Sequence, residues 1–239
     1  MADFEIPNFK LKPITVIRFP VKKFGGVYRV RSVKGSPYQM YSAIFSVELI
    51  RYIQQHAKTN VGQMYRIGII SPYAIQNTIV TKLIERIGVG PVEVVTGTVH
   101  GFQGDECNLI LVILNPPKNI TRSPRTFLNK KNILNVAISR AKDKMILMIP
   151  FDPDGELNIQ DLHQIKYIES LAGRLPGCKP FVIGYEAADL EKAFWGSESF
   201  IEENCLSTTH QNVNVYAEVI KKYEVRQDEN AIDVIVKTQ

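Results

Sequence analysis

Short apolar runs alternate, over the first 150 residues of this 239-residue chain, with longer segments whose apolar side chains recur at helical spacing. Strand-like runs cover residues 14–19, 66–70, 92–96, 108–114 and 144–149, and helical spacing covers residues 41–57, 72–87 and 126–142. This alternation predicts an α/β fold, with a mostly parallel sheet and helices on both of its faces. The uninterrupted apolar run from Leu109 to Leu114 is typical of a central strand buried on both sides.

The flanking segments do not continue this alternation. We interpret residues 1–13, which contain two prolines, as a linker. We expect one domain over residues 14–150 and a small acidic α+β extension over residues 151–239, whose role the sequence does not indicate. The extension is predicted to contain a helix at 162–171 and strands at 216–225 and 231–236.

Charge divides the chain in the same place. Residues 1–150 hold 21 Lys and Arg against 8 Asp and Glu, whereas residues 151–239 hold 8 against 16. A basic body with an acidic end indicates an anionic partner for the body. The alternative is an ordinary solvated surface, because a count of charges does not show where they gather.

Several classes of protein are disfavoured by composition. The three cysteines, at positions 107, 178 and 205, are scattered and lack the spacing of a metal site, so we predict no bound metal in this chain. The longest apolar run has six residues, which is too short to cross a membrane. The start of the chain does not resemble a secretory signal, and we expect a cytoplasmic protein.

Three loops carry groups suited to anion or nucleotide chemistry. In the first, Ser71 to Gln76, a serine N-cap and Pro72 open a helix, whose free N–H groups favour an anion. An ordinary capped helix start is the alternative. In the second, Thr96 to Glu106, Thr98 and His100 are candidates for bonding phosphates.

The same second loop offers Gln103 and Glu106 for sugar hydroxyls or a water molecule, and its glycines allow close approach of the backbone. A tight loop with capping polar groups is the alternative. In the third loop, Asn135 to Lys142, Arg140 stands near the predicted helix end, where it can reach a charge on a neighbouring lobe. A surface arginine at a helix end is the alternative.

Together these segments resemble the motor domains of superfamily 1 helicases. The sequence from Gly101 to Glu106, GFQGDE, resembles motif V, and the NVAISRA sequence from Asn135 resembles motif VI. Ser71 to Gln76 resembles the S/T-P-Y-x-x-Q element that precedes them. The branch most similar is the one that contains the up-frameshift RNA helicases and the Dna2-type nuclease-helicases. The resemblance covers about residues 14–150 and implies a second RecA-like, AAA-type lobe.

The resemblance also implies roles for individual residues. In such helicases ATP and Mg²⁺ lie between two RecA-like lobes, and single-stranded DNA or RNA crosses both lobes. It implies nucleotide-facing positions for Gln103, Gly104, Glu106, Arg140 and Gln76, among which Arg140 is the arginine finger and Gln76 lies at the lobe interface. It implies nucleic-acid contacts for Ser71, Pro72, Tyr73, Thr98 and His100.

Two departures from the family pattern limit what this chain is expected to do. It contains no Gly-Lys dipeptide, so it has no phosphate loop, and it lacks the Gln-Tyr-Arg-Met segment of the branch. We therefore expect no ATP hydrolysis by the chain alone and a phosphate-loop lobe upstream in the complete protein. The alternative is a stand-alone nucleotide- or nucleic-acid-binding regulatory domain without turnover.

Overall fold

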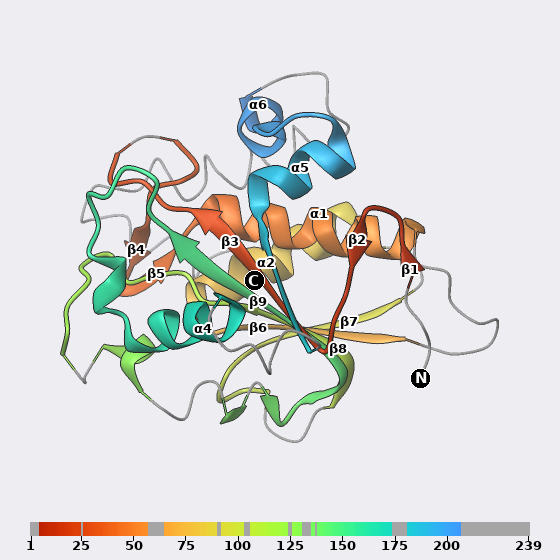
Figure 1. The fold of residues 1–239 in the computed structure, drawn as a ribbon, viewed down its shortest axis with the longest axis horizontal. Coiled ribbons are helices and arrows are strands. Elements are labelled where there is room, and N and C mark those ends of the chain that lie inside the picture. The colour runs from red at the N-terminus through yellow and green to blue at the C-terminus, as the bar shows by residue number, and fades with distance from the viewer. Residues whose placement is uncertain are drawn as a thin grey trace, which may run out of the picture.

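The computed structural model describes residues 5–24, 26–56, 65–89, 92–102, 106–123, 126–130, 135–136, 138–173 and 181–206. A six-stranded sheet forms its centre, with the strand order β10-β3-β9-β8-β6-β7 (Figure 1). All neighbouring strands of this sheet are parallel, which confirms the predicted α/β architecture. The strands are β3 (Ile14–Pro20), β6 (Arg66–Ser71), β7 (Glu93–Thr98), β8 (Cys107–Ile113), β9 (Ala141–Phe151) and β10 (Val182–Glu186).

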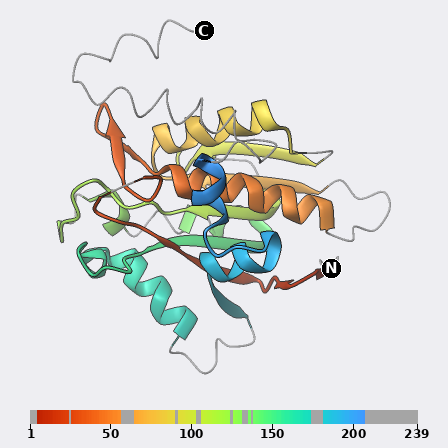
Figure 2. The ribbon, with the colours of Figure 1, turned by 90° about the horizontal axis from the view of Figure 1, so that it is seen from above.

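Helices cover both faces of the sheet, as the alternation predicts (Figure 2). One face is packed by α1 (Met40–His56), α2 (Ala74–Ile87), α5 (Ala187–Trp195) and α6 (Phe200–Leu206). The other face is packed by α4 (His163–Gly173) and by the short 3-10 helices η1 (Phe127–Asn129) and η2 (Ile159–Asp161).

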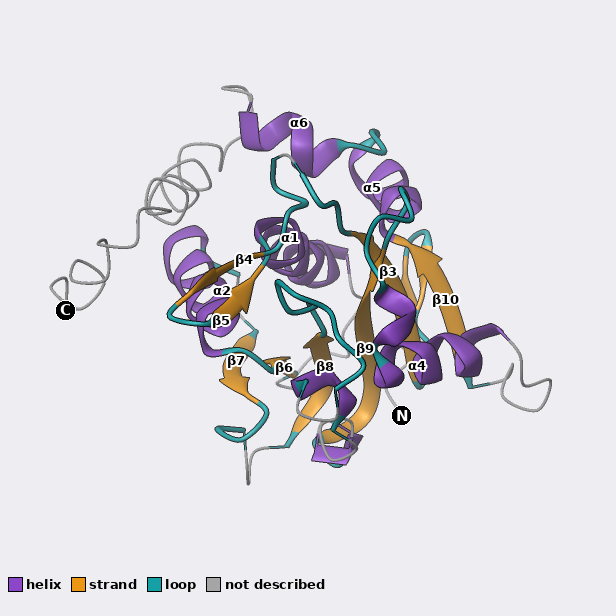
Figure 3. Ribbon diagram, turned by 90° about the vertical axis from the view of Figure 1, so that its left-hand side faces the viewer, coloured by secondary structure: helices purple, strands orange, loops and turns teal. Residues whose placement is uncertain are grey.

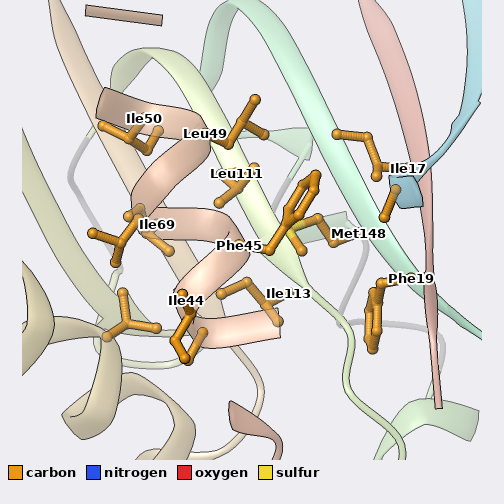
Figure 4. Packing of buried hydrophobic residues seen from close by; sticks show 14 of the residues in the cluster. Ile17, Phe19, Ile44, Phe45, Leu49, Ile50, Ile69, Leu111, Ile113 and Met148 are labelled. Atoms are coloured by element: carbon orange, nitrogen blue, oxygen red, sulfur yellow. The ribbon is translucent and has the colours of Figure 1, made fainter. Parts of the chain in front are cut away.

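Strand β8 lies inside the sheet and is covered on both of its faces by the helical layers. Alternate side chains of this strand point to opposite faces, so Leu109, Leu111 and Ile113 pack in the cluster under α1, while Ile110 and Val112 pack in the cluster under α4. Figure 4 shows Leu111 and Ile113 beneath Phe45 and Leu49 of α1. Each such side chain contributes about 1.5–3 kcal/mol on burial, which explains why this strand needs apolar residues throughout.

The segment predicted as a linker packs against the domain. Its described residues form a short antiparallel pair, β1 (Glu5–Ile6) and β2 (Phe9–Lys10). Phe9 is buried, and its ring lies 5.3 Å from the ring of Tyr185 and 5.5 Å from that of Phe194. The start and the later part of the chain are therefore joined by an aromatic cluster.

The sheet also extends past residue 150. β10 pairs with β3 in parallel, from Val182 opposite Ile14 to Glu186 opposite Arg18, and α4 covers the adjacent face. The sheet is therefore not complete at residue 150, and the described part of 151–206 packs with it. The predicted helix at 162–171 is confirmed as α4, whereas the predicted strands at 216–225 and 231–236 lie outside the described residues.

Two predicted elements begin or end in the wrong place. The predicted helix over 126–142 is too long, because β9 starts at Ala141 and pairs there with Cys107 of β8. Ser71 is not a helix N-cap, because it is the last residue of β6 and pairs with Thr98, which extends β7 into the predicted loop. α2 begins at Ala74, with Tyr73 as an N-cap that makes no side-chain bond. Gly88 ends α2 as predicted, with a φ of 74°.

Candidate nucleotide and nucleic-acid sites

The predicted site residues divide between the two edges of the sheet. Because all six strands are parallel, their amino ends meet at one edge and their carboxyl ends at the other. Glu106 and Arg140 directly precede β8 and β9 at the amino edge, whereas Ser71 and Thr98 end β6 and β7 at the carboxyl edge. Figure 3 looks onto the side of the molecule where β3 and β9 end. Six-residue β6 spans about 20 Å between the two edges.

At the amino edge, the described end of the segment that resembles motif V lies beside the end of the segment that resembles motif VI. The backbone N–H of Cys107 donates to the carbonyl oxygen of Arg140 at 3.0 Å, and Lys142 Nζ lies 3.2 Å from Glu106 Oε2. Both partners of this ion pair are about half exposed, with side-chain exposures of 53% and 55%, so the pair contributes at most about 1 kcal/mol. The backbone bond and the ion pair together hold the start of β8, which follows Glu106, against the start of β9, which follows Arg140.

Arg140 follows a short turn that fixes its backbone. The Ser139 N–H donates to the Asn135 carbonyl oxygen at 3.1 Å, and the Ser139 hydroxyl donates to the Val136 carbonyl oxygen at 2.9 Å. Arg140 Nε is shielded from solvent and has no hydrogen-bond partner among the described residues. A buried guanidinium donor without a partner is suited to an anion brought by another surface.

A polar network that the sequence patterns did not reveal crosses four strands at the amino edge. Asn108 accepts the Arg66 N–H at 3.1 Å and donates to Asp143 Oδ2 at 3.0 Å, so it links β6, β8 and β9. Arg66 Nε donates to Glu93 Oε1 of β7 at 2.9 Å. This network holds the strand ends that carry Glu106 and Arg140 in register. Only the register of the sheet, which the sequence did not supply, brings these polar residues together.

The loop between β7 and β8 is anchored by Phe102, a motif residue to which the sequence assigned no role. Its side chain is 1% exposed and lies over two glycines, because a Cβ on Gly68 would stand 2.7 Å from Phe102 Cζ and one on Gly97 2.8 Å from Phe102 Cδ2. The Phe102 N–H donates to the Thr98 carbonyl oxygen at 2.9 Å, and the Gly101 N–H donates to the Thr98 hydroxyl at 3.1 Å. Both glycines are therefore required for close approach.

The turn between β6 and α2 offers fewer free groups than predicted. Ser71 and Pro72 are buried, and the Ser71 hydroxyl accepts the Tyr73 N–H at 3.2 Å. The Ile75 N–H donates to the Ser36 hydroxyl at 3.1 Å, so a side chain of this protein already occupies part of the predicted anion site. Burial raises the pKa of the Tyr73 phenol well above its usual range, so the ring stays neutral.

Three of the predicted nucleic-acid residues are open to solvent to some degree. Tyr73 and Thr98 are half-buried, and His100 is exposed. They lie at the carboxyl edge, where β7 ends beside β6. The structure therefore groups Tyr73, Thr98 and His100, with Ser71 and Pro72 beneath them. Gln103 and Gly104, the remaining loop candidates, lie outside the described residues.

Gln76 does not join Glu106 and Arg140. It lies in the first turn of α2, at the carboxyl edge, and is fully buried. Its Oε1 accepts the Gln39 N–H at 2.8 Å, and its Nε2 donates to the Ser42 hydroxyl at 3.2 Å. The side chain ties the start of α2 to the start of α1, which occupies both of its polar atoms.

Two comparisons relate the chain to known proteins. Residues 24–149 match the family model of the AAA domain. The chain belongs to the AAA domain family. Over 82 residues it is 42% identical to the DNA replication ATP-dependent helicase/nuclease DNA2 of Mus musculus, a match that covers 34% of this chain and 7% of that relative. These findings place this AAA domain in a helicase-like branch of the P-loop superfamily, and it spans a small fraction of that relative.

The described part of this AAA domain shows no cluster of three or more His, Cys, Asp and Glu side chains suited to holding a metal. At the amino edge Glu106 is paired with Lys142, and Asp143 is bonded to Asn108. Mg²⁺ requires about six oxygen ligands, several of them water or phosphate, so these carboxylates do not fit a site of their own for the ion. Among the described helices, none has the length and apolar character needed to cross a bilayer.

Proposed function

We propose that this AAA domain is the second motor lobe of an ATP-dependent helicase or translocase that acts on single-stranded nucleic acid. The observation that carries the proposal is the hydrogen bond from Cys107 to Arg140, which brings the motif V and motif VI segments together at the amino edge. The residues predicted to contact nucleic acid lie at the other edge, around Thr98. A motor needs two such separate surfaces, one for the nucleotide and one for the track.

In this proposal Arg140 acts on the nucleotide of a partner lobe. ATP hydrolysis moves negative charge onto the transferring phosphoryl group, and an arginine from a second lobe stabilises that charge. Arg140 suits this role because its Nε has no partner among the described residues. Glu106 would accept a hydrogen bond from a ribose hydroxyl or a water, together with Gln103 and Gly104. The partner lobe would cradle the phosphates and hold Mg²⁺, which neutralises phosphate charge when bound.

The nucleic-acid track would begin at Tyr73, Thr98 and His100, with Ser71 and Pro72 supporting the turn from below. Hydroxyl and imidazole groups at the end of a strand are suited to phosphate oxygens. DNA is favoured over RNA because the matched relative is named for DNA replication. Gln76 would contribute by holding the start of α2, and not by contact with ATP.

A second candidate function is a binding domain without turnover. The absence of any Gly-Lys dipeptide favours it, because the chain has no phosphate loop of its own. Reading the gene upstream of codon 1 distinguishes the two. An in-frame phosphate loop supports the motor lobe, whereas a stop codon without one supports a binding or regulatory domain.

The decisive test is ATP hydrolysis by the polypeptide that carries both lobes, measured with saturating single-stranded DNA. Arg140→Ala is expected to lower the rate by about 10³- to 10⁵-fold, because the transition-state charge loses its arginine. Arg122→Ala is the matched control, because Arg122 is 82% exposed and pairs with Asp161 on another part of the lobe. Wild-type turnover by the Arg140→Ala protein would remove the support for this role.

A further inference from the structure

The segment between β3 and α1, residues 20–38, is unusually basic. It contains Lys22, Lys23, Arg29, Arg31 and Lys34 and no Asp or Glu. We call residues 20–38 the basic loop. None of the predicted site residues lies in it, and it forms part of the lobe that accounts for most of the positive charge of the chain.

The base of the basic loop is fixed from inside. Buried Gln39 donates from Nε2 to the carbonyl oxygens of Pro20 at 2.9 Å and Tyr28 at 2.8 Å. The Tyr41 N–H donates to the Val27 carbonyl oxygen at 3.1 Å. These bonds satisfy the backbone of a segment that leaves the sheet, so its outer side chains stand on a fixed base.

The outer part of the basic loop carries one exposed aromatic ring, Phe24, and the base of the loop carries a buried one, Tyr28. Phe24 is 67% exposed, and Lys23 Nζ lies 5.3 Å from the centre of its ring. Lys22 Nζ lies 5.2 Å from the centre of the Tyr28 ring, and Lys22 bridges to Arg29 in the backbone. An exposed ring beside a lysine, in a segment rich in cations, suits the binding of a single nucleic-acid strand, because a base can stack on the ring and phosphates can pair with the cations.

The tip of the basic loop carries a lysine in an unfavourable conformation. β4 (Arg31–Val33) and β5 (Ser36–Tyr38) form a hairpin whose two turn residues, Lys34 and Gly35, have φ angles of 49° and 76°. Such turns favour Asn-Gly over Lys-Gly, because at positive φ the Cβ of most residues crowds the backbone carbonyl oxygen, whereas Asn is tolerated through local hydrogen bonds of its side chain. Strain of this kind is retained where a side chain is needed, and Lys34 is exposed.

The hairpin adjoins the residues already grouped at the carboxyl edge. Ser36 of β5 accepts the Ile75 N–H at the start of α2, two residues after Tyr73 (Figure 3). The basic loop therefore continues the surface that holds Tyr73 and Thr98. A single nucleic-acid strand that passes from Thr98 along this edge would reach the hairpin.

We propose that the basic loop is a second contact surface for single-stranded nucleic acid, in which Phe24 stacks on a base and Lys22, Lys23 and Lys34 pair with phosphates. The proposal rests on the proposed function for its choice of polymer. It is tested by binding alone, whereas the motor role is tested by ATP turnover in Arg140→Ala, so either can fail without the other.

The test is fluorescence anisotropy of the full chain with a labelled oligothymidine of about 20 nucleotides, over a range of salt concentrations. Phe24→Ala is expected to weaken binding about fivefold or more, and each of Lys23→Ala and Lys34→Ala to lower the slope of log affinity against log salt by about one. Lys166→Ala and Tyr167→Ala are matched controls, because this exposed lysine-aromatic pair lies on α4, on the other face of the sheet. They are expected to stay within twofold of wild type.

Lys34→Asn separates binding from folding. Asn tolerates positive φ, so this variant is expected to unfold at the same or a higher temperature than wild type while binding DNA more weakly. Abasic oligonucleotide gives a second separation, because the loss caused by Phe24→Ala should disappear when there is no base to stack on. Vesicles of anionic phospholipid serve as the comparison ligand.

Three results would overturn the proposal. The first is wild-type affinity for DNA in Phe24→Ala and Lys34→Asn. The second is no binding of the oligonucleotide by wild-type chain. The third is a loss of vesicle binding in these variants with unchanged DNA binding, which would assign the loop to a membrane surface.

Discussion

The amino edge of the sheet and the basic loop differ in where their basic residues lie relative to acids. At the amino edge, Lys142 pairs with Glu106 and Arg66 pairs with Glu93. At the carboxyl edge, the basic loop has five cations and no acid within its own sequence. Paired charges fix a geometry, whereas an excess of one charge attracts a polyanion. The net charge of the chain therefore says less about where a polyanion binds than the place where unmatched cations gather.

The largest expected effect concerns Phe102, which anchors the loop that runs from one edge to the other. Phe102→Ala is expected to lower the free energy of unfolding by about 3–5 kcal/mol, because it leaves a cavity over Gly68 and Gly97. Denaturant unfolding followed by circular dichroism measures it. Gly68→Ala alone should also destabilise, by about 1–3 kcal/mol, because its Cβ would stand 2.5 Å from Ile110 Cδ1 and 2.7 Å from Phe102 Cζ.

In the double variant the two costs should not add, because the new methyl group enters space that Phe102 has left. Strict additivity would mean that Phe102 does not rest on Gly68. The loop between β7 and β8 would then be anchored by some other contact.

The next effect concerns Glu191 of α5, which accepts a hydrogen bond from Tyr41 and another from the Ile201 N–H at 2.7 Å. Burial raises the pKa of Glu191 from 4.5 to about 7, and Glu203 and Glu202 add to the shift, against the two hydrogen bonds, which lower it. The folded state therefore holds this proton more tightly than the unfolded state. Its contribution to stability is fully present below about pH 4.5 and is lost as the pH rises through 7.

As the pH rises between these values, the free energy of unfolding of wild type should fall by on the order of 3 kcal/mol more than that of Glu191→Gln, because the amide of the variant does not titrate. Denaturant unfolding of both proteins at several pH values measures the difference. Parallel pH profiles would show that Glu191 does not bind its proton more tightly in the folded state than in the unfolded state.

A smaller effect concerns Glu202 of α6, which approaches the basic loop. A Cβ on Gly26 would stand 3.9 Å from Glu202 Oε1, so one carboxylate flanks the proposed DNA surface. Glu202→Gln is expected to tighten oligothymidine binding about twofold at low salt and to have no effect at high salt. Glu169→Gln on α4 is the control. Weaker binding in Glu202→Gln would place the strand elsewhere on this edge.

The smallest expected effect tests the separation of the edges directly. Arg140→Ala should leave the affinity of the isolated chain for oligothymidine within about twofold of wild type, because β6 spans about 20 Å between the edges and charges are screened within about 10 Å. The same anisotropy measurement gives the result. A tenfold loss of affinity would mean that Arg140 belongs to the surface that binds the oligonucleotide.

Sequence patterns predicted the sheet well and its contacts less well. The apolar run of β8 and the Gly88 helix end follow from local chemistry, and both are confirmed. The early start of β9 depends on pairing of Ala141 with Cys107, which no local pattern encodes. The burial of Gln76 depends on Gln39, which lies 37 positions away in sequence. The roles of Gln103 and Gly104 stay predictions, because these residues lie outside the described part of the chain.

The pairing of β10 with β3 has a consequence for how the chain is made. Val182 lies opposite Ile14, so the outer strand of the sheet comes from a segment that leaves the ribosome long after its neighbour. Until then β3 presents an open edge with unsatisfied N–H and carbonyl groups, which other chains can pair with. Slow closure of such distant contacts prolongs that exposure. β10 therefore covers this side of β3 only after it has been synthesised and has paired, so the interval before pairing is when the chain is most exposed to aggregation.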